Sequence, residues 1–304
     1  MRLQVYLSCL VNFFTAFSLI FCPSLMTCGW LISVAWCFWI AVTLLIASVI
    51  SLLMFRLQRP NDRQIEAFFG NDWPSVSICH RGGAAEAPEN TTFAFREANK
   101  NGSKFVEFDV GLTKDGVPVL LHDDSVDRTT NGTGALKNLT LAEVLKLNAA
   151  AKHPLREKFP QASIPTLEEA TVECLSLGLN IFFDVKDWST EVRRQDPAIL
   201  TALTTCTNLI QFEFGCDMTG PLWKRSLCIL GDYLLLWSQS AWLWILCGNA
   251  ATLLDKKIVT ENIVDYWAQR GTKTVVWTVN DKIEKEYFHR CLQCGVITDS
   301  VQAS

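Results

Sequence analysis

The alternation of short apolar runs with helical stretches beyond residue 70 most restricts the fold of this 304-residue chain. Several helical stretches end in a glycine just before the next apolar run, at Gly102, Gly178 and Gly271, as helices capped by glycine do. This alternation predicts an α/β fold with a parallel sheet. We expect strands at 75–79, 104–109, 117–121, 179–185, 198–204, 272–279 and 295–299, and helices at 91–100, 140–147, 166–177 and 260–270.

Polar residues capable of chemistry stand at the carboxyl ends of these predicted strands. His80 and His122 each follow an apolar run, and Glu107 and Asp109 close another. A TIM-type (β/α)8 barrel builds its site from such strand ends. We therefore predict a TIM-type barrel over residues 70–304, with an open doubly wound sheet as the alternative.

The predicted barrel is short of about one β/α unit after residue 186. Only about ten residues, mostly polar, separate Lys186 from the apolar run at 198–204, whereas a parallel crossover needs about a dozen or more. The chain consequently offers one strand fewer than a closed barrel requires.

The N-terminal segment has the composition of a membrane anchor. No charged side chain occurs from Leu3 to Phe55, and the apolar runs at 5–21 and 30–55 approach or exceed the roughly 20 residues that span a bilayer. We predict a hydrophobic anchor over 1–56 with one or two spans. A signal peptide is the alternative for the first run.

The sequence contains opposing signals for the side of the membrane on which the domain after residue 56 lies. Arg56, Arg59 and Arg63 favour a cytoplasmic domain by the positive-inside rule. Four triplets that only a lumenal domain could use for N-glycosylation favour the opposite side. They are Asn90-Thr-Thr, Asn101-Gly-Ser, Asn131-Gly-Thr and Asn138-Leu-Thr.

A third apolar segment, Tyr233 to Leu254, is uncharged and rich in tryptophan. If it crossed a bilayer, the last two predicted strands would lie across the membrane from the histidines, and one barrel cannot straddle a bilayer. We therefore predict an apolar, membrane-associated insertion at 226–254 within the barrel, with its tryptophans at the lipid interface. The net charge of −4 and the lack of a basic run argue against nucleic acid as a partner.

Three carboxylates form the candidate metal site. Glu107 and Asp109 are two residues apart on a predicted strand, so their side chains point to one face. Asp184 ends another apolar run, with Lys186 on the same face. Hard oxygen ligands of this kind suit Mg²⁺, or alternatively Ca²⁺.

Two histidines and two cationic side chains complete the constellation. Arg81 follows His80 and has the planar fork that grips phosphate, while Lys186 could hold the same anion. His80 and His122 could act as base and acid on either side of a phosphodiester. A bound metal would polarise the phosphoryl oxygen.

This set of motifs resembles the glycerophosphodiester phosphodiesterase family, and with its apolar segments it is most similar to the membrane-bound animal members. The motifs that carry the resemblance are His80-Arg-Gly-Gly, Ala87-Pro-Glu-Asn-Thr91, Glu107-Phe-Asp109, Asp115-Gly-Val-Pro-Val-Leu-Leu-His-Asp123, Asp127-Arg-Thr-Thr130, Thr133-Gly134, Ile164-Pro-Thr-Leu-Glu168, Trp277-Thr-Val-Asn280 and Ile297-Thr-Asp299.

The resemblance implies a TIM-type barrel that hydrolyses glycerophosphodiesters to glycerol 3-phosphate and an alcohol. It implies His80 and His122 as the catalytic pair. The implied metal ligands are Glu107, Asp109 and Asp184, and the implied substrate-binding residues are Arg81, Lys186 and Trp277.

The same resemblance extends to substrate and location. The implied substrates are glycerophosphodiesters such as glycerophosphoinositol and glycerophospho-N-acylethanolamines, or lysophospholipid-like molecules, and the lipid bilayer is an implied partner. The implied location is the plasma membrane or endomembrane vesicles, with the catalytic domain extracellular or lumenal.

Two alternatives remain beside this hypothesis. One is a hydrolase like phosphatidylinositol phospholipase C, which also uses two histidines in a related barrel. The other is a membrane interaction protein with weak catalysis, because the missing unit after residue 186 leaves the barrel open.

Overall fold

The computed structural model describes residues 29–54, 56–185, 199–216 and 220–302. The chain divides into two units, Met1–Arg56 and Leu57–Ser304, and each is taken by itself. The second unit holds the sheet and every described residue of the predicted site.

The first unit contains one described helix, α2 (Gly29–Met54), without acidic or basic residues in its first or last turn. Large apolar side chains from Trp36 to Met54 are exposed along it. None of the helices in the described ranges has the length and hydropathy of a membrane span. The anchor predicted over 1–56 is therefore not confirmed and stays a prediction.

The second unit is built on a curled sheet whose strands run in the order β4-β2-β1-β8-β7-β6-β5, all parallel to their neighbours. The sheet does not close within the described residues, because no pairing joins β4 to β5. The strand bounds are β1 Ser77–Cys79, β2 Phe105–Leu112, β3 Pro118–Leu120, β4 Asn180–Val185, β5 Ala202–Thr205, β6 Ala251–Asp255, β7 Lys273–Trp277 and β8 Gly295–Thr298.

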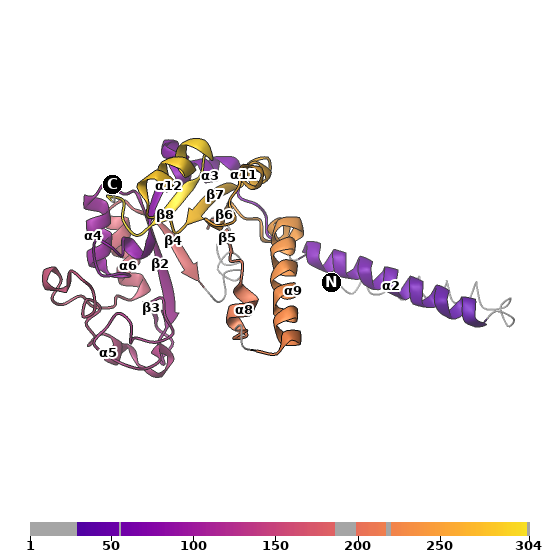
Figure 1. Ribbon diagram of the computed structural model, residues 1–304, viewed down its shortest axis with the longest axis horizontal. Helices are drawn as coiled ribbons and strands as arrows, with labels where there is room; N and C mark the ends of the chain where they lie inside the picture. Colours follow the sequence, from indigo (N-terminus) through magenta and orange to yellow (C-terminus); the bar gives the residue numbers. More distant parts are fainter. Residues whose placement is uncertain (1–28, 55, 186–198, 217–219, 303–304) are drawn as a thin grey trace, which may run out of the picture. The chain divides into compact units, whose positions relative to one another are not determined.

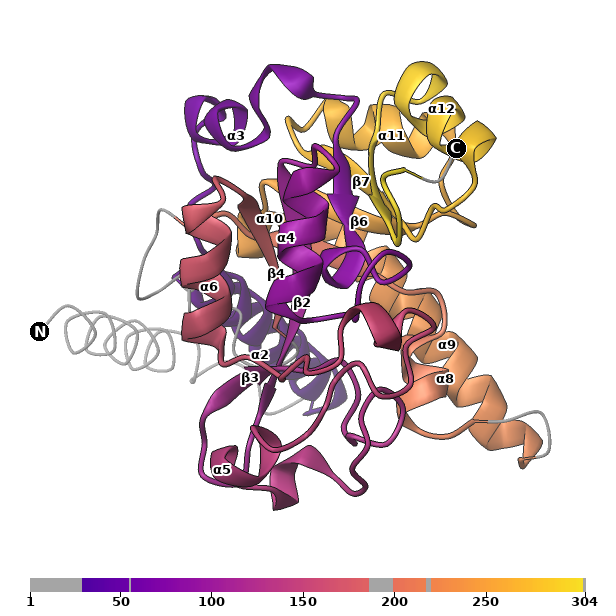
Figure 2. The ribbon, with the colours of Figure 1, turned by 90° about the vertical axis from the view of Figure 1, so that its left-hand side faces the viewer.

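Helices cover the outer face of this sheet. Figures 1 and 2 both place α4 and α6 over β2 and β4. Thr91 caps α4, and Thr166 with Glu169 forms a capping box at α6. The helix bounds are α3 Asp62–Phe69, α4 Thr92–Lys100, α5 Leu141–Val144, α6 Leu167–Ser176, α8 Leu209–Glu213, α9 Leu222–Ser238, α10 Trp244–Cys247, α11 Glu261–Ala268 and α12 Lys282–Glu286.

The parallel α/β architecture was predicted, but four strands differ from expectation. β2 continues to Leu112, so Asp109 lies within the strand and does not close it. β3 pairs antiparallel with β2, because the turn at Thr113–Val117, closed by the Thr113 N–H to Val117 carbonyl bond, is too short for a parallel crossover. β5 begins at Ala202 rather than residue 198. β6 lies where the sequence placed the end of the apolar insertion, since uncharged residues are equally compatible with a buried strand.

The two faces of β2 serve two cores. Phe108 is fully buried against Phe95 of α4 and belongs to the layer between sheet and helices. Phe105 points to the other face, where it packs with Ile78 and Val275 inside the curled sheet. The alternation of a strand therefore gives Glu107 and Asp109 to the inner face.

We expect Phe108→Ala to lower the free energy of unfolding by about 3–5 kcal/mol, because it leaves a cavity between β2 and α4. Denaturant unfolding followed by circular dichroism would measure the change. Val172→Ala on exposed α6 is the matched control. An effect of Phe108→Ala no larger than that of the control would contradict the packing role.

Candidate active site

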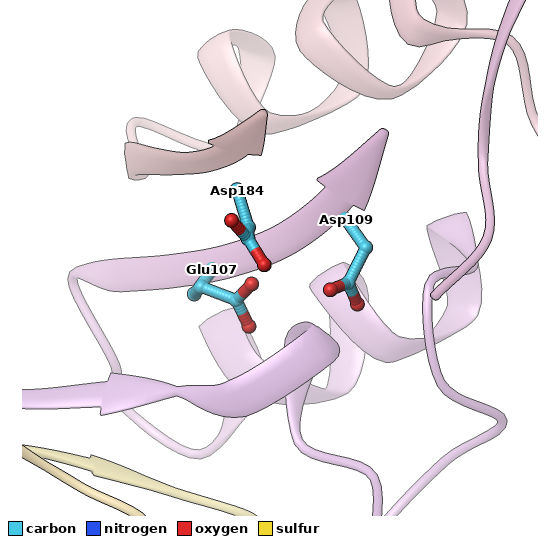
Figure 3. Close-up of side chains that lie close together, drawn as sticks. All are labelled: Glu107, Asp109 and Asp184. Atoms are coloured by element: carbon cyan, nitrogen blue, oxygen red, sulfur yellow. The ribbon is translucent and has the colours of Figure 1, made fainter. Parts of the chain in front are cut away.

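Glu107, Asp109 and Asp184 form the one cluster of potential metal ligands found in the described part of the chain. One carboxylate oxygen from each lies within 4.8 Å of the others. Figure 3 shows the three side chains turned toward a common point. The predicted metal ligands are thus brought together.

Sheet register explains this meeting. β2 and β4 are parallel neighbours in which Asp109 lies beside Asp184, and Glu107 stands two residues earlier on the same face. Glu107 and Asp109 are buried, whereas Asp184 is partly exposed. Burial raises the pKa of Glu107 well above its usual value, and the charges of Asp109 and Asp184 add to the effect.

This donor set fits a hard divalent cation. Three carboxylates repel one another at these distances, and a cation between them would offset that repulsion. The described protein cation nearest this group is Arg81, whose Nε lies 3.4 Å from Asp109 Oδ2. This guanidinium is shared with Glu89, which accepts from its Nη1 at 3.0 Å, so it does not neutralise the cluster alone.

The loop after β1 connects the first histidine to this cluster. Arg81 has φ 52°, in the left-handed region, and its backbone N–H donates to Glu107 Oε2 at 2.9 Å. Gly82 follows with φ 83°, and a Cβ there would lie 2.7 Å from Ala94 Cβ of α4. Glycine is therefore required where the loop passes over the helix.

His80 is held by a residue from the far end of the chain. Its Nδ1 lies 2.6 Å from Asp299 Oδ1, and Asp299 Oδ2 accepts from Asn280 Nδ2 at 2.6 Å. Burial alone would raise the pKa of Asp299, but the hydrogen bonds from His80 and Asn280 hold it below its usual value. The ionised carboxylate thus fixes the imidazole orientation.

His122 has an equivalent partner in its neighbour. Its Nδ1 lies 2.6 Å from Asp123 Oδ1. Asp123 has a pKa lowered to about 2, because bonds from Arg128 and His122 outweigh its partial burial. Asp123 directly follows His122 in the sequence and orients its ring.

Several residues of the site lay outside the sequence hypothesis. The family motifs in the sequence contain four further residues to which no function was assigned, namely Glu89, Arg128, Asn280 and Asp299. Asn90 donates to Asp109 Oδ2 at 2.9 Å and is buried, so the first glycosylation triplet serves the site instead. The available signal was position after a strand for Asp299, which follows β8, and for Asn280, three residues after β7.

Two expected substrate contacts have different outcomes. Lys186 lies outside the described residues. Trp277 is the last residue of β7, and its buried indole N–H has no hydrogen-bond partner in the described structure. It is packed against the inner core cluster that contains Ile78.

Comparison with known proteins decides the family. Residues 80–210 match the family model "Glycerophosphoryl diester phosphodiesterase family". The chain is 40% identical to mouse (Mus musculus) glycerophosphodiester phosphodiesterase 1, covering 80% of this chain and 82% of the mouse protein. The chain belongs to the glycerophosphodiester phosphodiesterase family. The predicted phosphodiesterase class of enzyme is thereby confirmed.

A second relative is similar to the same extent, and a solved structure has a similar fold. The human (Homo sapiens) glycerophosphodiester phosphodiesterase 1 is 41% identical over the same shares of both chains. In fold, the chain resembles an Oleispira antarctica phosphodiesterase solved with sn-glycerol-3-phosphate, with a TM-score of 0.57 at 24% identity, covering 77% of this chain and 95% of that one. This structural similarity confirms the predicted TIM-barrel-like fold.

The alignment with the mouse family member also bears on the expected shortage. It spans 274 positions but covers 80% of this 304-residue chain, or about 243 residues. About 30 positions (274 less 243) therefore have no residue here. This number is consistent with the absence of one β/α unit.

We expect Mg²⁺ at about 100 times its Kd to stabilise the parent chain by about 2.7 kcal/mol, because it binds the folded cluster alone. Asp109→Asn should lose most of that gain, since it removes a buried ligand charge. Thermal unfolding with and without Mg²⁺ measures both. Asp72→Asn, which breaks an exposed ion pair with Lys104, is the control; an equal Mg²⁺ effect in Asp109→Asn would contradict the assignment.

Proposed function

We propose that this protein hydrolyses glycerophosphodiesters to glycerol 3-phosphate and an alcohol, with a divalent metal and two histidines. The observation that carries the proposal is the placement of two aspartate-bound histidines, His80 and His122, next to strands that bear three converging carboxylates. Such a combination serves acid/base chemistry on a phosphodiester.

The histidines exchange protons with the substrate through their Nε2 atoms. Each Nδ1 is engaged by a carboxylate at 2.6 Å, by Asp299 for His80 and by Asp123 for His122. An Nδ1–H tautomer leaves Nε2 to take a proton from the attacking hydroxyl, and the protonated partner gives one to the leaving oxygen.

Glu107, Asp109 and Asp184 would hold the metal, and Mg²⁺ is favoured by the all-oxygen ligand set, with Ca²⁺ as the alternative. Bound there, the ion would supply a Lewis acid for a phosphoryl oxygen. Arg81 keeps its Nη2 without a partner in the described structure, and we assign it to the substrate phosphate.

The remaining substrate contacts follow from family likeness. Lys186 is proposed as a second phosphate ligand, and Trp277 as a flank for the glycerol at the end of β7. Proposed substrates are glycerophosphoinositol and glycerophospho-N-acylethanolamines. Nucleic acid is not a proposed substrate.

We expect His122→Ala to abolish Mg²⁺-dependent release of glycerol 3-phosphate from glycerophosphoinositol, because one of the two proton-transfer groups is lost. An enzyme-coupled assay, run with and without a chelator, measures the release. His153→Gln is the control, since glutamine can still donate to the Ala84 carbonyl that His153 contacts. Equal rates in the His122→Ala and parent proteins would contradict the proposal.

The same assay tests the two alternatives. A stable cyclic inositol phosphate as product would favour the phospholipase C-like hydrolase. The open sheet between β4 and β5 favours the interaction protein with weak catalysis, because strand edges that a further unit would cover are left without partners among the described residues. No release by the parent, together with no Mg²⁺ effect on unfolding, would support that reading.

We also propose that the chain is an integral membrane protein with its catalytic unit on the extracellular or lumenal side. Exposed apolar side chains along α2 support an anchor. The glycosylation triplets at Asn131 and Asn138 are exposed and fit the same side.

Helix α9 is proposed as the second lipid contact. It lies beside α8, held by Asp232, which accepts from Ile210 N–H at 2.7 Å and Gln211 Nε2 at 2.8 Å. Its large apolar side chains stay exposed, with tryptophans among them, as in helices that lie in the lipid interface. The exposed apolar side chains of α9 are Leu222, Trp223, Leu227, Ile229, Leu230, Tyr233, Leu234 and Trp237.

We expect a fluorophore attached at Trp237→Cys to be quenched by brominated lipids when the full chain is reconstituted in liposomes, because α9 contacts the acyl boundary. A label at Ile283→Cys, an exposed apolar position on α12, should not be quenched. Labelling of the parent chain gives the background from its own cysteines. Equal quenching at both positions would contradict the role of α9.

A further inference from the structure

Arg128 bridges two carboxylates that both adjoin the site. Its Nε donates to Asp123 Oδ2 at 2.6 Å, and its Nη2 reaches Asp123 Oδ1 at 3.2 Å. On its other edge, Nη1 donates to Glu89 Oε2 at 2.8 Å and Nη2 to Glu89 Oε1 at 2.7 Å. The guanidinium thus makes a bidentate contact with each anion.

The first of these anions leads to the catalytic histidine. Asp123 uses Oδ1 for His122 Nδ1, and Arg128 fixes the plane of the same carboxylate. An aspartate on a loop could otherwise rotate about its side-chain bonds. Arg128 therefore determines the direction in which Asp123 presents its oxygen to the imidazole.

The second anion leads to the phosphate-binding arginine. Glu89 Oε1 also accepts from Arg81 Nη1 at 3.0 Å. Glu89 lies just before α4, where its neighbour Asn90 is bonded to Asp109, so its backbone is held by the metal cluster. Its side chain is 15% exposed. A carboxylate this buried between two guanidiniums has little freedom to move.

We propose that Arg128 and Glu89 are positioning residues that link His122 to Arg81. This inference rests on the proposed function and deepens it. Arg128 holds Asp123 against His122, and Glu89 turns Arg81 so that its Nη2 faces the substrate phosphate. One rigid ionic network therefore sets both the proton-transfer group and the phosphate ligand.

The electrostatics of the network agree with the geometry. Although burial would raise it, the pKa of Glu89 is lowered by Arg128 and Arg81. The pKa of Arg128 is raised by its bonds to Glu89 and Asp123. Lysine cannot replace this arginine, because a single ammonium lacks the two donating edges.

The test measures kinetics of glycerol 3-phosphate release from glycerophosphoinositol by the full chain with Mg²⁺. We expect Arg128→Met to reduce kcat by about 10- to 100-fold, the loss that a displacement of about 1 Å can cause. Arg128→Lys should recover little of it. Guanidinium ion added at millimolar concentration should restore part of the Arg128→Met rate, and Glu89→Gln should raise KM more than it lowers kcat.

A double mutant separates positioning from general destabilisation. Because Arg128 acts on His122 through Asp123, the Arg128→Met and Asp123→Asn losses should not add in the double variant. Arg96→Met, which breaks the exposed ion pair with Glu173, is the matched control and should keep the parent kinetics. Additive losses, or a parent-like rate in Arg128→Met, would overturn the proposal.

An inactive parent protein would show that the proposed function is wrong. A second measurement, which does not depend on activity, still tests the contact between Arg128 and Asp123. Carboxyl carbon NMR of the parent and Arg128→Met proteins follows the titration of Asp123. Loss of Arg128 should raise its pKa from about 2 toward the usual aspartate value. An unchanged Asp123 titration would overturn the link from Arg128 to His122 whatever the activity.

Discussion

The structure of this site depends on offsetting the mutual repulsion of three carboxylates that lie side by side on β2 and β4. Glu107 and Asp109 cannot turn away, because β2 is fixed between two cores, and Asp184 meets them through sheet register. Burial and the neighbouring charges raise the pKa of Glu107. The surroundings accordingly supply compensating groups: the Arg81 N–H, the Arg81 guanidinium and the Asn90 amide.

Charge compensation continues outward from this centre. Arg81 is held by Glu89, Glu89 by Arg128, and Arg128 by Asp123, which orients His122. Opposite charges alternate along the whole path, so each group has a partner on both sides. On the other flank, Asn280 and Asp299 orient His80 without joining this path.

The open sheet does not disturb these contacts. The groups named above lie on β2 and β4 or on loops that follow β1, β3, β7 and β8, and these strands are paired in one continuous array. β5, at the opposite end of the sheet, supplies none of them. About 30 aligned positions of the mouse relative are missing here, yet the three carboxylates converge in this chain.

The sequence by itself determined the alternation of strands and helices and the chemistry of Glu107, Asp109, Asp184 and the two histidines, because those patterns are local. It did not determine every strand end, since β2 runs three residues past Asp109. Tertiary structure decided which groups hold them. Asp299 reaches His80 across 219 residues, since β1 and β8 are paired, and β3 returns antiparallel to bring His122 back. The uncharged residues at 251–254 are compatible with either a helix or a strand. They form β6 because they pair with β5 and β7 in the folded protein.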